Sequence, residues 1–471
     1  MKKLSTHALQ GAFWNVLIRN TLFVITFIGN IFLIRMLVPG DYGTFALILS
    51  IVDIIFIIGS LGISNACVYY HDDDPDVFET GMVLSWVLAL ILVCASFIAV
   101  IILNLFSLYS GLVLLLILLT SIVNSLNIPT SVYLANIECN LDFKKSALLT
   151  FVGPILGLLV GLWLANNEFG IWALFYKNSL AVLLTFVIVF FISKSSIKFS
   201  YSKYISKKIL RYGLGIFYQR VSEIFSIRLP MFLLSFLAGV TVLGLYERSR
   251  YLAQLQNTVL DTVFGKVAFT IYSKVKNNSK AVTKGCQLTL LFVSRLSFLS
   301  ALLVFYYSDF IIALLFGNEW KESSGFLQGF SLLIISSSLY GPMLYTAMSR
   351  GILKSVTVVT IVMGFINICG LTIIWLTGLD WSLFSWVPGL SITIGCMWLS
   401  LILLHNGIKL NWVPIIFHSF MLVAVSIFVK ELSAVYYSET IQILLILIVW
   451  SLLTFAINRN EISYLYERIK K

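Results

Sequence analysis

The sequence predicts an all-α, polytopic membrane protein of about 14 transmembrane helices. Its composition is the first observation, because 59% of the 471 residues are hydrophobic and only 11% are charged. A soluble domain usually carries about 25% charged residues. The second observation is a mean hydropathy of +0.97 over the whole chain. A soluble core could not cover this much apolar surface. The composition therefore excludes a cytosolic enzyme, a secreted disulfide scaffold, a coiled coil and a disordered regulator.

The charge and the cysteines exclude further classes. The formal net charge is +11, but in a membrane protein an excess of Lys and Arg is first an orientation signal. Nucleic acid is therefore not expected as a partner. The six cysteines are scattered, without close pairs, and in apolar runs a thiol behaves as a small hydrophobe. Neither a disulfide framework nor a metal site is expected.

The individual spans follow from a scan for about 20 apolar residues, the length that a helix needs to cross a bilayer. Fourteen segments satisfy this length. They are centred near Leu22, Ile54, Leu92, Ile122, Leu156, Leu183, Phe225, Val259, Leu296, Ile335, Ile366, Ile392, Leu422 and Ile446. The eighth is unusually polar between Leu245 and Ser273. The stretch from Asp309 to Phe316 is too short to cross and is expected to lie at the membrane interface.

The distribution of basic residues predicts the orientation. With the N-terminus inside and the loops alternating, 21 of the 32 basic residues fall in cytoplasmic segments, and only three fall in outside loops. Such a bias follows the positive-inside rule. Both termini are therefore expected to face the cytoplasm.

The most polar segment between spans predicts the domain organisation. Residues 193–212 are rich in Lys and Ser, which predicts a basic cytoplasmic linker. Spans 1–6 before it form an N-terminal lobe over residues 1–192, and spans 7–12 form a C-terminal lobe over 213–404. Residues 405–471 add a C-terminal helix pair and a tail.

An internal repeat supports two lobes of the same orientation. The stretch that begins at Phe32 resembles the stretch that begins 201 positions later at Leu233, and the offset aligns Gly43 with Gly244. The same offset places Arg19 on Arg220. Parallel repeats related by an axis along the membrane normal are a transporter architecture, with the binding site between the lobes near the midplane. The sequence thus predicts two parallel six-helix lobes around a central cavity.

Four short motifs carry a resemblance to a known family. They are Gly11-Ala12-Phe13-Trp14, the run from Leu33 to Gly43 (LIRMLVPGDYG), Leu61-Gly62-Ile63 and Gly244-Leu245-Tyr246 with the basic residues after it. In these motifs and in the order of its segments, the chain resembles the polysaccharide transporter family. This family comprises the Wzx-type flippases of the multidrug/oligosaccharidyl-lipid/polysaccharide exporter (MOP) superfamily.

The resemblance implies a function and partners. It implies a flippase that moves an undecaprenyl-diphosphate-linked oligosaccharide repeat unit across the bacterial inner membrane by alternating access. The product would serve the synthesis of O-antigen (the lipopolysaccharide side chain), capsule or exopolysaccharide. The expected partners are this glycan lipid, the bilayer, a polysaccharide polymerase and a chain-length regulator. The chain would be a secondary transporter and no enzyme, and no cofactor is expected.

The charges within the spans are the candidate site residues. An ionisable side chain there costs about 2.5–3.5 kcal/mol by insertion scales, so it usually faces a cavity or a partner. Guanidinium groups suit a diphosphate, because they hold phosphate oxygens in bidentate, charge-assisted hydrogen bonds, and amides suit the sugars. The candidates for substrate binding are Arg19, Arg220, Arg250, Arg295, Asn15, Gln254 and Asn257. The candidates for ion coupling or ion pairing in the cavity are Asp53, Glu223, Glu247, Asp261 and Lys177.

Several alternatives remain open from the sequence. Arg220–Glu223 and Glu247–Arg250 have the spacing of simple i,i+3 ion pairs between packed helices. A drug or metabolite exporter of the same superfamily would prefer an acidic or aromatic cavity, whereas this chain has more arginine. An integral-membrane polysaccharide polymerase would need large external loops, which the sequence lacks. A scaffold without transport activity is disfavoured by the number of charges within spans.

Overall fold

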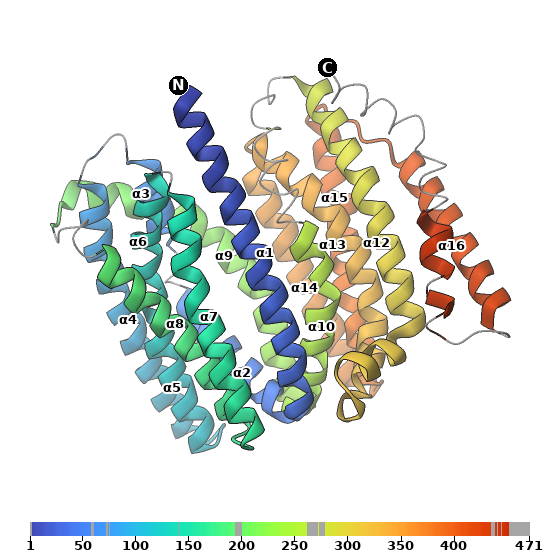
Figure 1. The fold of residues 1–471 in the computed structure, drawn as a ribbon, viewed down its shortest axis with the longest axis horizontal. Helices are drawn as coiled ribbons and strands as arrows, with labels where there is room; N and C mark the ends of the chain where they lie inside the picture. Colours follow the sequence, from blue (N-terminus) through green and yellow to red (C-terminus); the bar gives the residue numbers. More distant parts are fainter. Residues whose placement is uncertain are drawn as a thin grey trace. The chain divides into compact units, whose positions relative to one another are not determined.

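The all-α class is confirmed by a computed structural model. It describes residues 2–57, 61–71, 74, 76–140, 142–193, 200–260, 272, 278–434, 439, 441–443 and 445–451. Within these residues every regular element is a helix (Figure 1). Ten helices of this part of the chain are long and apolar enough to cross a membrane. The predicted segments near Ile54, Val259, Leu422 and Ile446 are not among the ten, so the number 14 stays a prediction.

The chain divides into two compact units, Met1–Leu245 and Tyr246–Lys471. The first contains α1 (Lys2–Met36), α2 (Pro39–Ile55), α3 (Ile63–Tyr69), α4 (Val77–Leu105), α5 (Gly111–Ser125), α6 (Asn127–Cys139), α7 (Phe143–Asn166), α8 (Ile171–Ser193) and α9 (Lys203–Ala238). The boundary falls within α10 (Val240–Leu260). The second contains α12 (Ser279–Leu315), α13 (Ser323–Ser349), α14 (Leu353–Thr377), α15 (Trp386–His405) and α16 (Trp412–Ala434).

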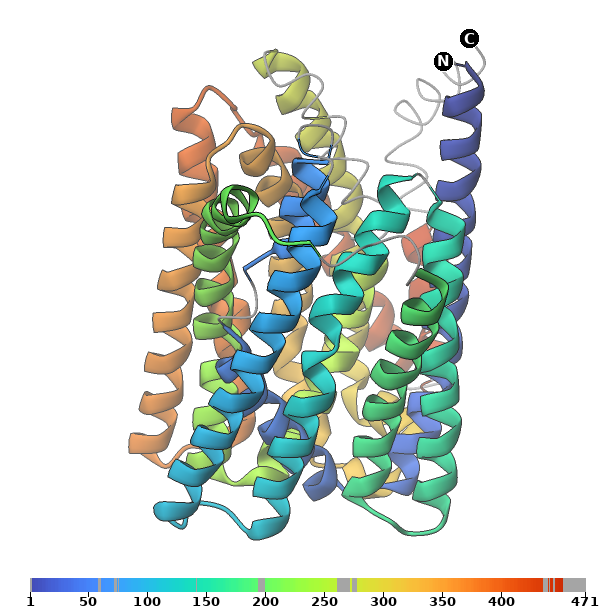
Figure 2. The same cartoon turned by 90° about the vertical axis from the view of Figure 1, so that its left-hand side faces the viewer.

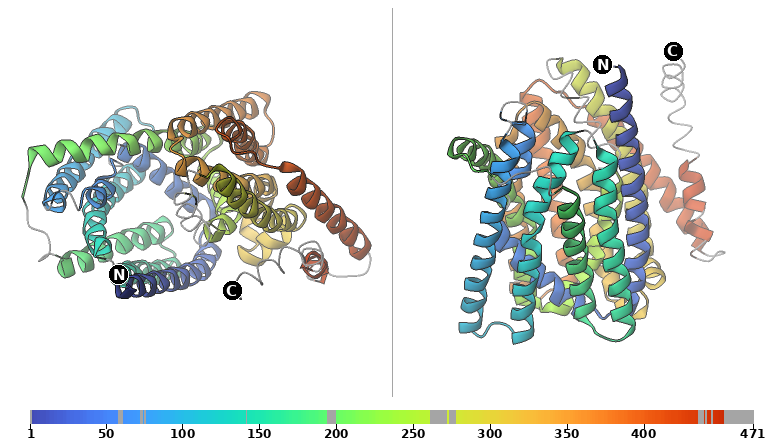
Figure 3. Two further views of the ribbon diagram at one scale, coloured as in Figure 1. Left: turned by 90° about the horizontal axis from the view of Figure 1, so that it is seen from above. Right: turned by 60° about the vertical axis from the view of Figure 1, so that its left-hand side comes forward.

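In the first unit, α9 has the most unusual course. Its first turns lie across the ends of the neighbouring helices, and Figure 3 (left) shows them lengthwise where those helices appear nearly end-on. Figure 2 shows the same turns end-on, beside the parallel helices α4 to α8. Ile205 and Ile209 of these turns are buried in a core that also contains Tyr133 of α6. The basic side chains of Lys203, Lys207 and Arg211 stay exposed, so the segment is amphipathic, like a helix at a membrane surface.

The contacts of α9 bear on the predicted lobes. The sequence assigned this helix to the C-terminal lobe, but it packs against α2, α3 and α4 and belongs to the first compact unit. The predicted lobes are groups of helices that would move together during transport. The packing in a single structure does not show which helices move together. The division into 1–192, 193–212, 213–404 and 405–471 therefore stays a prediction.

Three glycines four residues apart hold α7 against α8. A Cβ atom at Gly153 would lie 2.5 Å from the Ala181 carbonyl oxygen, and one at Gly157 would overlap the Lys177 carbonyl oxygen. Gly161 faces the Lys177 side chain in the same way. Small residues at this spacing let the backbones of membrane helices approach closely, and the contact between α7 and α8 has this geometry.

We expect a Gly157→Val substitution to destabilise the first unit strongly. The added side chain would occupy space that the α8 backbone already fills, and overpacking of this kind costs about 1–3 kcal/mol or more. The measurement is the yield of monodisperse protein and its melting temperature in detergent. Gly111→Val is the matched control, because no atom lies within 4 Å of a Cβ at Gly111. Equal stability of both variants would contradict the proposed close contact.

A second glycine contact joins the starts of α2 and α10. A Cβ atom at Gly43 would overlap the Val240 carbonyl oxygen, and one at Gly244 would overlap the Pro39 carbonyl oxygen. Each of these Cβ positions also lies 2.9 Å from the backbone nitrogen of the other glycine. The contact is therefore reciprocal: Gly43 meets Val240 and Gly244 meets Pro39. The offset of 201 residues makes position 240 the equivalent of 39 and position 244 the equivalent of 43.

Two of the predicted segments contain a break or a bend in the structure. The span near Ile122 is divided at Leu126 into α5 and α6, because Pro129 has no N–H to donate to the Ser125 carbonyl and its ring crowds that carbonyl. The expectation of a separate interfacial piece from Asp309 to Phe316 was wrong. Almost all of this stretch belongs to α12, which continues to Leu315 after a bend at Tyr307 (φ −121°, ψ 27°).

In the second unit, α13 is the central helix. It packs on α12 and α15, and α15 packs on α14; Figure 1 shows these four helices side by side. Cys286, Met343 and Leu399 of α12, α13 and α15 are buried in one apolar core. This core leaves the first turns of α13 and its polar middle free to approach α10, where Ser249 Oγ donates to the Ser323 carbonyl at 2.8 Å.

Candidate functional site

Four charged side chains of α2 and α9 form a cluster in the first unit. Arg228 Nε lies 2.7 Å from Asp53 Oδ2, and Arg220 Nη1 lies 2.8 Å from Glu223 Oε2. Arg220 and Glu223 also act electrostatically on Asp53. The i,i+3 pairing that the sequence allowed for Arg220 and Glu223 is therefore present. The pair between Asp53 and Arg228 was not foreseen, because its members are far apart in the sequence.

The exposure of this cluster indicates that it faces water. The side chains of Arg220 and Glu223 are 54% and 48% exposed, and those of Arg228 and Asp53 are about one-third exposed. Charged side chains inside membrane spans are costly unless they face a partner or a water-filled space. A pair of packed helices that buries its ion pair would leave less of these groups exposed. The cluster is therefore suited to line an aqueous path.

Two other predicted residues of the first unit lie on α1 and α8. Arg19 is exposed on α1, which packs on α7. Lys177 Nζ of α8 donates to Asn30 Oδ1 of α1 at 2.6 Å, so Lys177 ties two helices together. The side chain of Asn15 lies outside the described residues. Arg220 lies on α9, which packs on α2, α3 and α4, whereas α1 with Arg19 packs on α7.

The charges of α10 include a pair between adjacent residues. Glu247 Oε2 accepts a hydrogen bond from Arg248 Nε at 2.5 Å, a partner that the sequence did not suggest beside the i,i+3 spacing of Glu247 and Arg250. The Arg248 guanidinium also lies over the Tyr251 ring, 5.2 Å from its centroid. Arg250 is half-buried in α10, as is Arg295 in α12. Asp261 lies outside the described residues.

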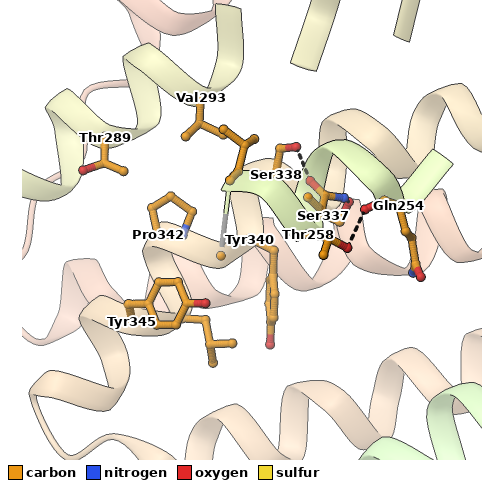
Figure 4. A pocket seen from close by; sticks show the side chains of 13 residues that line it. Gln254, Thr258, Thr289, Val293, Ser337, Ser338, Tyr340, Pro342 and Tyr345 are labelled. Atoms are coloured by element: carbon orange, nitrogen blue, oxygen red, sulfur yellow. Dashed lines mark hydrogen bonds between the residues drawn. The ribbon is translucent and has the colours of Figure 1, made fainter. Parts of the chain in front are cut away.

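Gln254 and Asn257, the two predicted amides of α10, line one cavity within the second unit (Figure 4). The cavity has a volume of about 310 Å³ and lies between α10, α12 and α13. Its other lining residues are Thr258, Leu260, Thr289, Val293, Ser337, Ser338, Tyr340, Gly341, Pro342, Leu344 and Tyr345. The α13 residues were not among the candidates predicted from the sequence. The signal that could have found them is the run of three serines before Tyr340 in the middle of an apolar span.

The described residues contain no candidate metal site. They contain no group of three or more His, Cys, Asp or Glu side chains with a geometry that could hold a metal ion.

Comparison with known proteins identifies the family and the fold. The sequence model of the family described as "polysaccharide biosynthesis protein" matches residues 32–325. The succinoglycan biosynthesis transport protein ExoT of Rhizobium meliloti (strain 1021) is 22% identical over 335 residues. This alignment covers 70% of the present chain and spans 66% of the length of that relative.

Two solved structures share the fold. The lipid II flippase MurJ in an inward closed conformation has a TM-score of 0.73 and 15% identity, with 94% of this chain and 99% of that chain covered. An inward-facing multidrug resistance MATE family transporter of the MOP superfamily has a TM-score of 0.65 and 12% identity, with 81% and 96% covered. The resemblance seen in the sequence motifs is thereby confirmed. The chain belongs to the polysaccharide biosynthesis protein family, and it has the multi-pass membrane fold of the MOP superfamily transporters.

Proposed function

We propose that the protein is a flippase that moves an undecaprenyl-diphosphate-linked oligosaccharide repeat unit across the bacterial inner membrane. The observation that carries the proposal is the set of exposed arginines within membrane spans of the first unit, Arg19 and Arg220 above all. Membership in a polysaccharide biosynthesis family supports a glycan as the cargo. The similarity to a protein named as a transport protein and the fold shared with a lipid II flippase support transport as the activity.

The charged cluster suggests how the diphosphate is held. The Arg220 guanidinium already binds a carboxylate oxygen of Glu223, and the Arg228 guanidinium binds Asp53. A diphosphate offers the same kind of acceptor oxygens with more negative charge, and guanidinium binds such oxygens in bidentate geometry. Because Arg220 and Glu223 are about half exposed, the substrate can reach this arginine and displace the carboxylate. Arg19, Arg250 and Arg295 are the further arginines proposed to contact the diphosphate.

The membrane potential is a sufficient source of energy in this proposal. Moving two negative charges outward, down an inside-negative potential, releases about 4–5 kcal/mol per 100 mV. Alternating access of the two lobes would expose the headgroup to each side in turn while the lipid tail stays in the bilayer. Asp53, Glu223, Glu247 and Asp261 are the carboxylates that could couple a cation to this cycle. Both termini are proposed to face the cytoplasm, and a polymerase and a chain-length regulator are proposed to act on the exported units.

We expect Arg19→Ala and Arg220→Ala to lower surface glycan by about tenfold or more, because each removes a charge-assisted contact worth about 1.5–3 kcal/mol. The measurement is complementation of a strain of the source bacterium that lacks this gene, with surface glycan normalised to the amount of protein in the membrane. Lys321→Ala is the matched control, because Lys321 is an exposed basic residue between α12 and α13. Full export by both arginine variants would overturn the diphosphate role of these residues.

The same strain separates a flippase from a polymerase. Without a flippase no repeat unit reaches the cell surface, whereas a strain without a polymerase still exports single units. Single units on the surface of the deletion strain would therefore contradict the proposed function and favour polymerisation.

A further inference from the structure

We propose that the cavity between α10, α12 and α13 binds an uncharged sugar ring of the glycan and does not bind the diphosphate. This proposal rests on the proposed function, because it assigns a place to one part of that substrate. It leaves the diphosphate to the arginines named above, none of which lines this cavity. All residues that line the cavity belong to the second unit.

The lining of the cavity is polar but uncharged. None of the 13 lining residues carries a formal charge, and eight of them bear a hydroxyl or an amide. A buried anion without a cationic partner is strongly disfavoured, so a phosphate or a uronic acid is a poor ligand here. A neutral ligand with many hydroxyl groups can instead exchange its hydrogen bonds to water for hydrogen bonds to these side chains.

Two hydrogen bonds to α13 fix the orientation of the Asn257 side chain. Ser338 Oγ donates to Asn257 Oδ1 at 2.5 Å, and Asn257 Nδ2 donates to Ser337 Oγ. Ser337 in turn donates to the Leu333 carbonyl of its own helix. An amide has two N–H donors and two lone pairs on its oxygen, so one donor and one lone pair of Asn257 remain. A fixed amide with both capacities matches two neighbouring hydroxyl groups of a sugar, and little side-chain entropy is lost on binding.

The backbone of α13 adds an acceptor to the cavity. Pro342 has no N–H, so α13 lacks the hydrogen bond that would otherwise end on the Ser338 carbonyl. Gly341, which has no side chain to cover the backbone, is also part of the lining. The Ser338 carbonyl therefore lacks its usual helical donor, and Ser338 is one of the lining residues.

The aromatic residues complete the match. Figure 4 shows Ser337, Ser338, Thr258 and Gln254 grouped together, with Tyr345 and Pro342 on the opposite side of the cavity. A sugar ring has polar edges and faces that are largely C–H, and a tyrosine ring offers an apolar face with a polar tip. The volume of about 310 Å³ lies at the lower end of the range for small-molecule sites, about 300–1,000 Å³. It suits one sugar unit and excludes a whole oligosaccharide.

The test is saturation-transfer difference NMR on the full-length protein in detergent, with D-glucose, D-galactose, D-mannose and N-acetyl-D-glucosamine as neutral probes. D-glucuronate and inorganic pyrophosphate are the charged probes. We expect transfer to at least one neutral sugar and at least about fivefold less to both anions. Asn257→Ala and Gln254→Ala should each reduce the sugar signal about fivefold, the effect of losing one or two hydrogen bonds. Asn406→Ala, which removes an amide that bonds only its own helix, should leave it unchanged.

Each opposite result would overturn the assignment. These results are no transfer to any neutral sugar, equal transfer to glucuronate, or an unchanged signal in both cavity variants that still elute as folded protein. The export assay of the preceding section keeps the two proposals apart. If the wild type exports glycan but shows no saturation transfer to any sugar, only the proposed sugar site is refuted. If saturation transfer is seen but the protein has no role in export, the proposed flippase function is refuted.

Discussion

Gly43→Val and Gly244→Val are each expected to abolish the accumulation of folded protein. The new side chain would enter the space of a backbone carbonyl, that of Val240 in the first variant and that of Pro39 in the second. Backbone atoms in two helices cannot yield as a flexible side chain does, so the starts of α2 and α10 would have to separate. We expect an effect beyond the usual cost of overpacking, which is about 1–3 kcal/mol.

The measurement is the amount of monodisperse protein extracted from membranes, followed by its melting temperature. Gly40→Val is the control, since Gly40 lies one turn earlier in α2 and a Cβ there meets only Thr241 Oγ1, at 3.8 Å. A Gly43 variant as stable as the Gly40 variant would show that the two helices do not touch at this point. The two glycines should also behave alike, because their contacts are reciprocal.

Arg228→Ala is expected to reduce both stability and export, because it leaves the carboxylate of Asp53 without the guanidinium 2.7 Å away. An uncompensated charge within a span is costly. Breaking a fully buried pair costs about 3–5 kcal/mol, and the present pair, about one-third exposed, should cost less. We therefore expect a several-fold loss of folded protein and a larger loss of surface glycan per molecule.

The double variant Asp53→Asn/Arg228→Gln separates the two effects. It removes both charges and keeps side chains of similar size, so the folded yield should recover. If Arg228 serves only to neutralise Asp53, export should recover with it. Recovery of yield without recovery of export would show that this cluster acts on the substrate or on a coupled ion. No loss in Arg228→Ala itself would contradict the ion pair.

Local patterns predicted the helices well. Apolar windows of bilayer length located the spans because hydrocarbon requires an apolar surface over that whole length. The spacing of Gly153, Gly157 and Gly161 is typical of close packing, because residues four apart share one face of a helix. The Arg220–Glu223 pair was visible for the same reason.

Pairings between distant helices could not be predicted. Asp53 and Arg228 meet because α9 packs on α2, and a single sequence does not show which helices become neighbours. The partner that Glu247 has in the structure was not foreseen either. Arg248 is held over the Tyr251 ring, and from there its long side chain reaches Glu247, although adjacent residues do not usually face each other on a helix.

The cavity residues of α13 were hidden by the ordinary behaviour of serine in membrane helices. Ser336 donates to the Leu332 carbonyl of its own helix, as serines in apolar spans commonly do. Ser338 instead reaches Asn257 of another helix. Sequence alone could not separate these two serines, since the difference lies in which one faces α10.

The crossing at Gly43 and Gly244 has a consequence for the origin of the chain. A contact in which residue i meets the image of j while j meets the image of i is isologous, the kind made by a symmetric dimer. Two identical copies of an ancestral half would have met glycine to glycine in this way, as a homodimer. Fusion of the two genes would then preserve the crossing inside one polypeptide. The two positions can no longer vary independently, because a side chain at either one closes the space that both share.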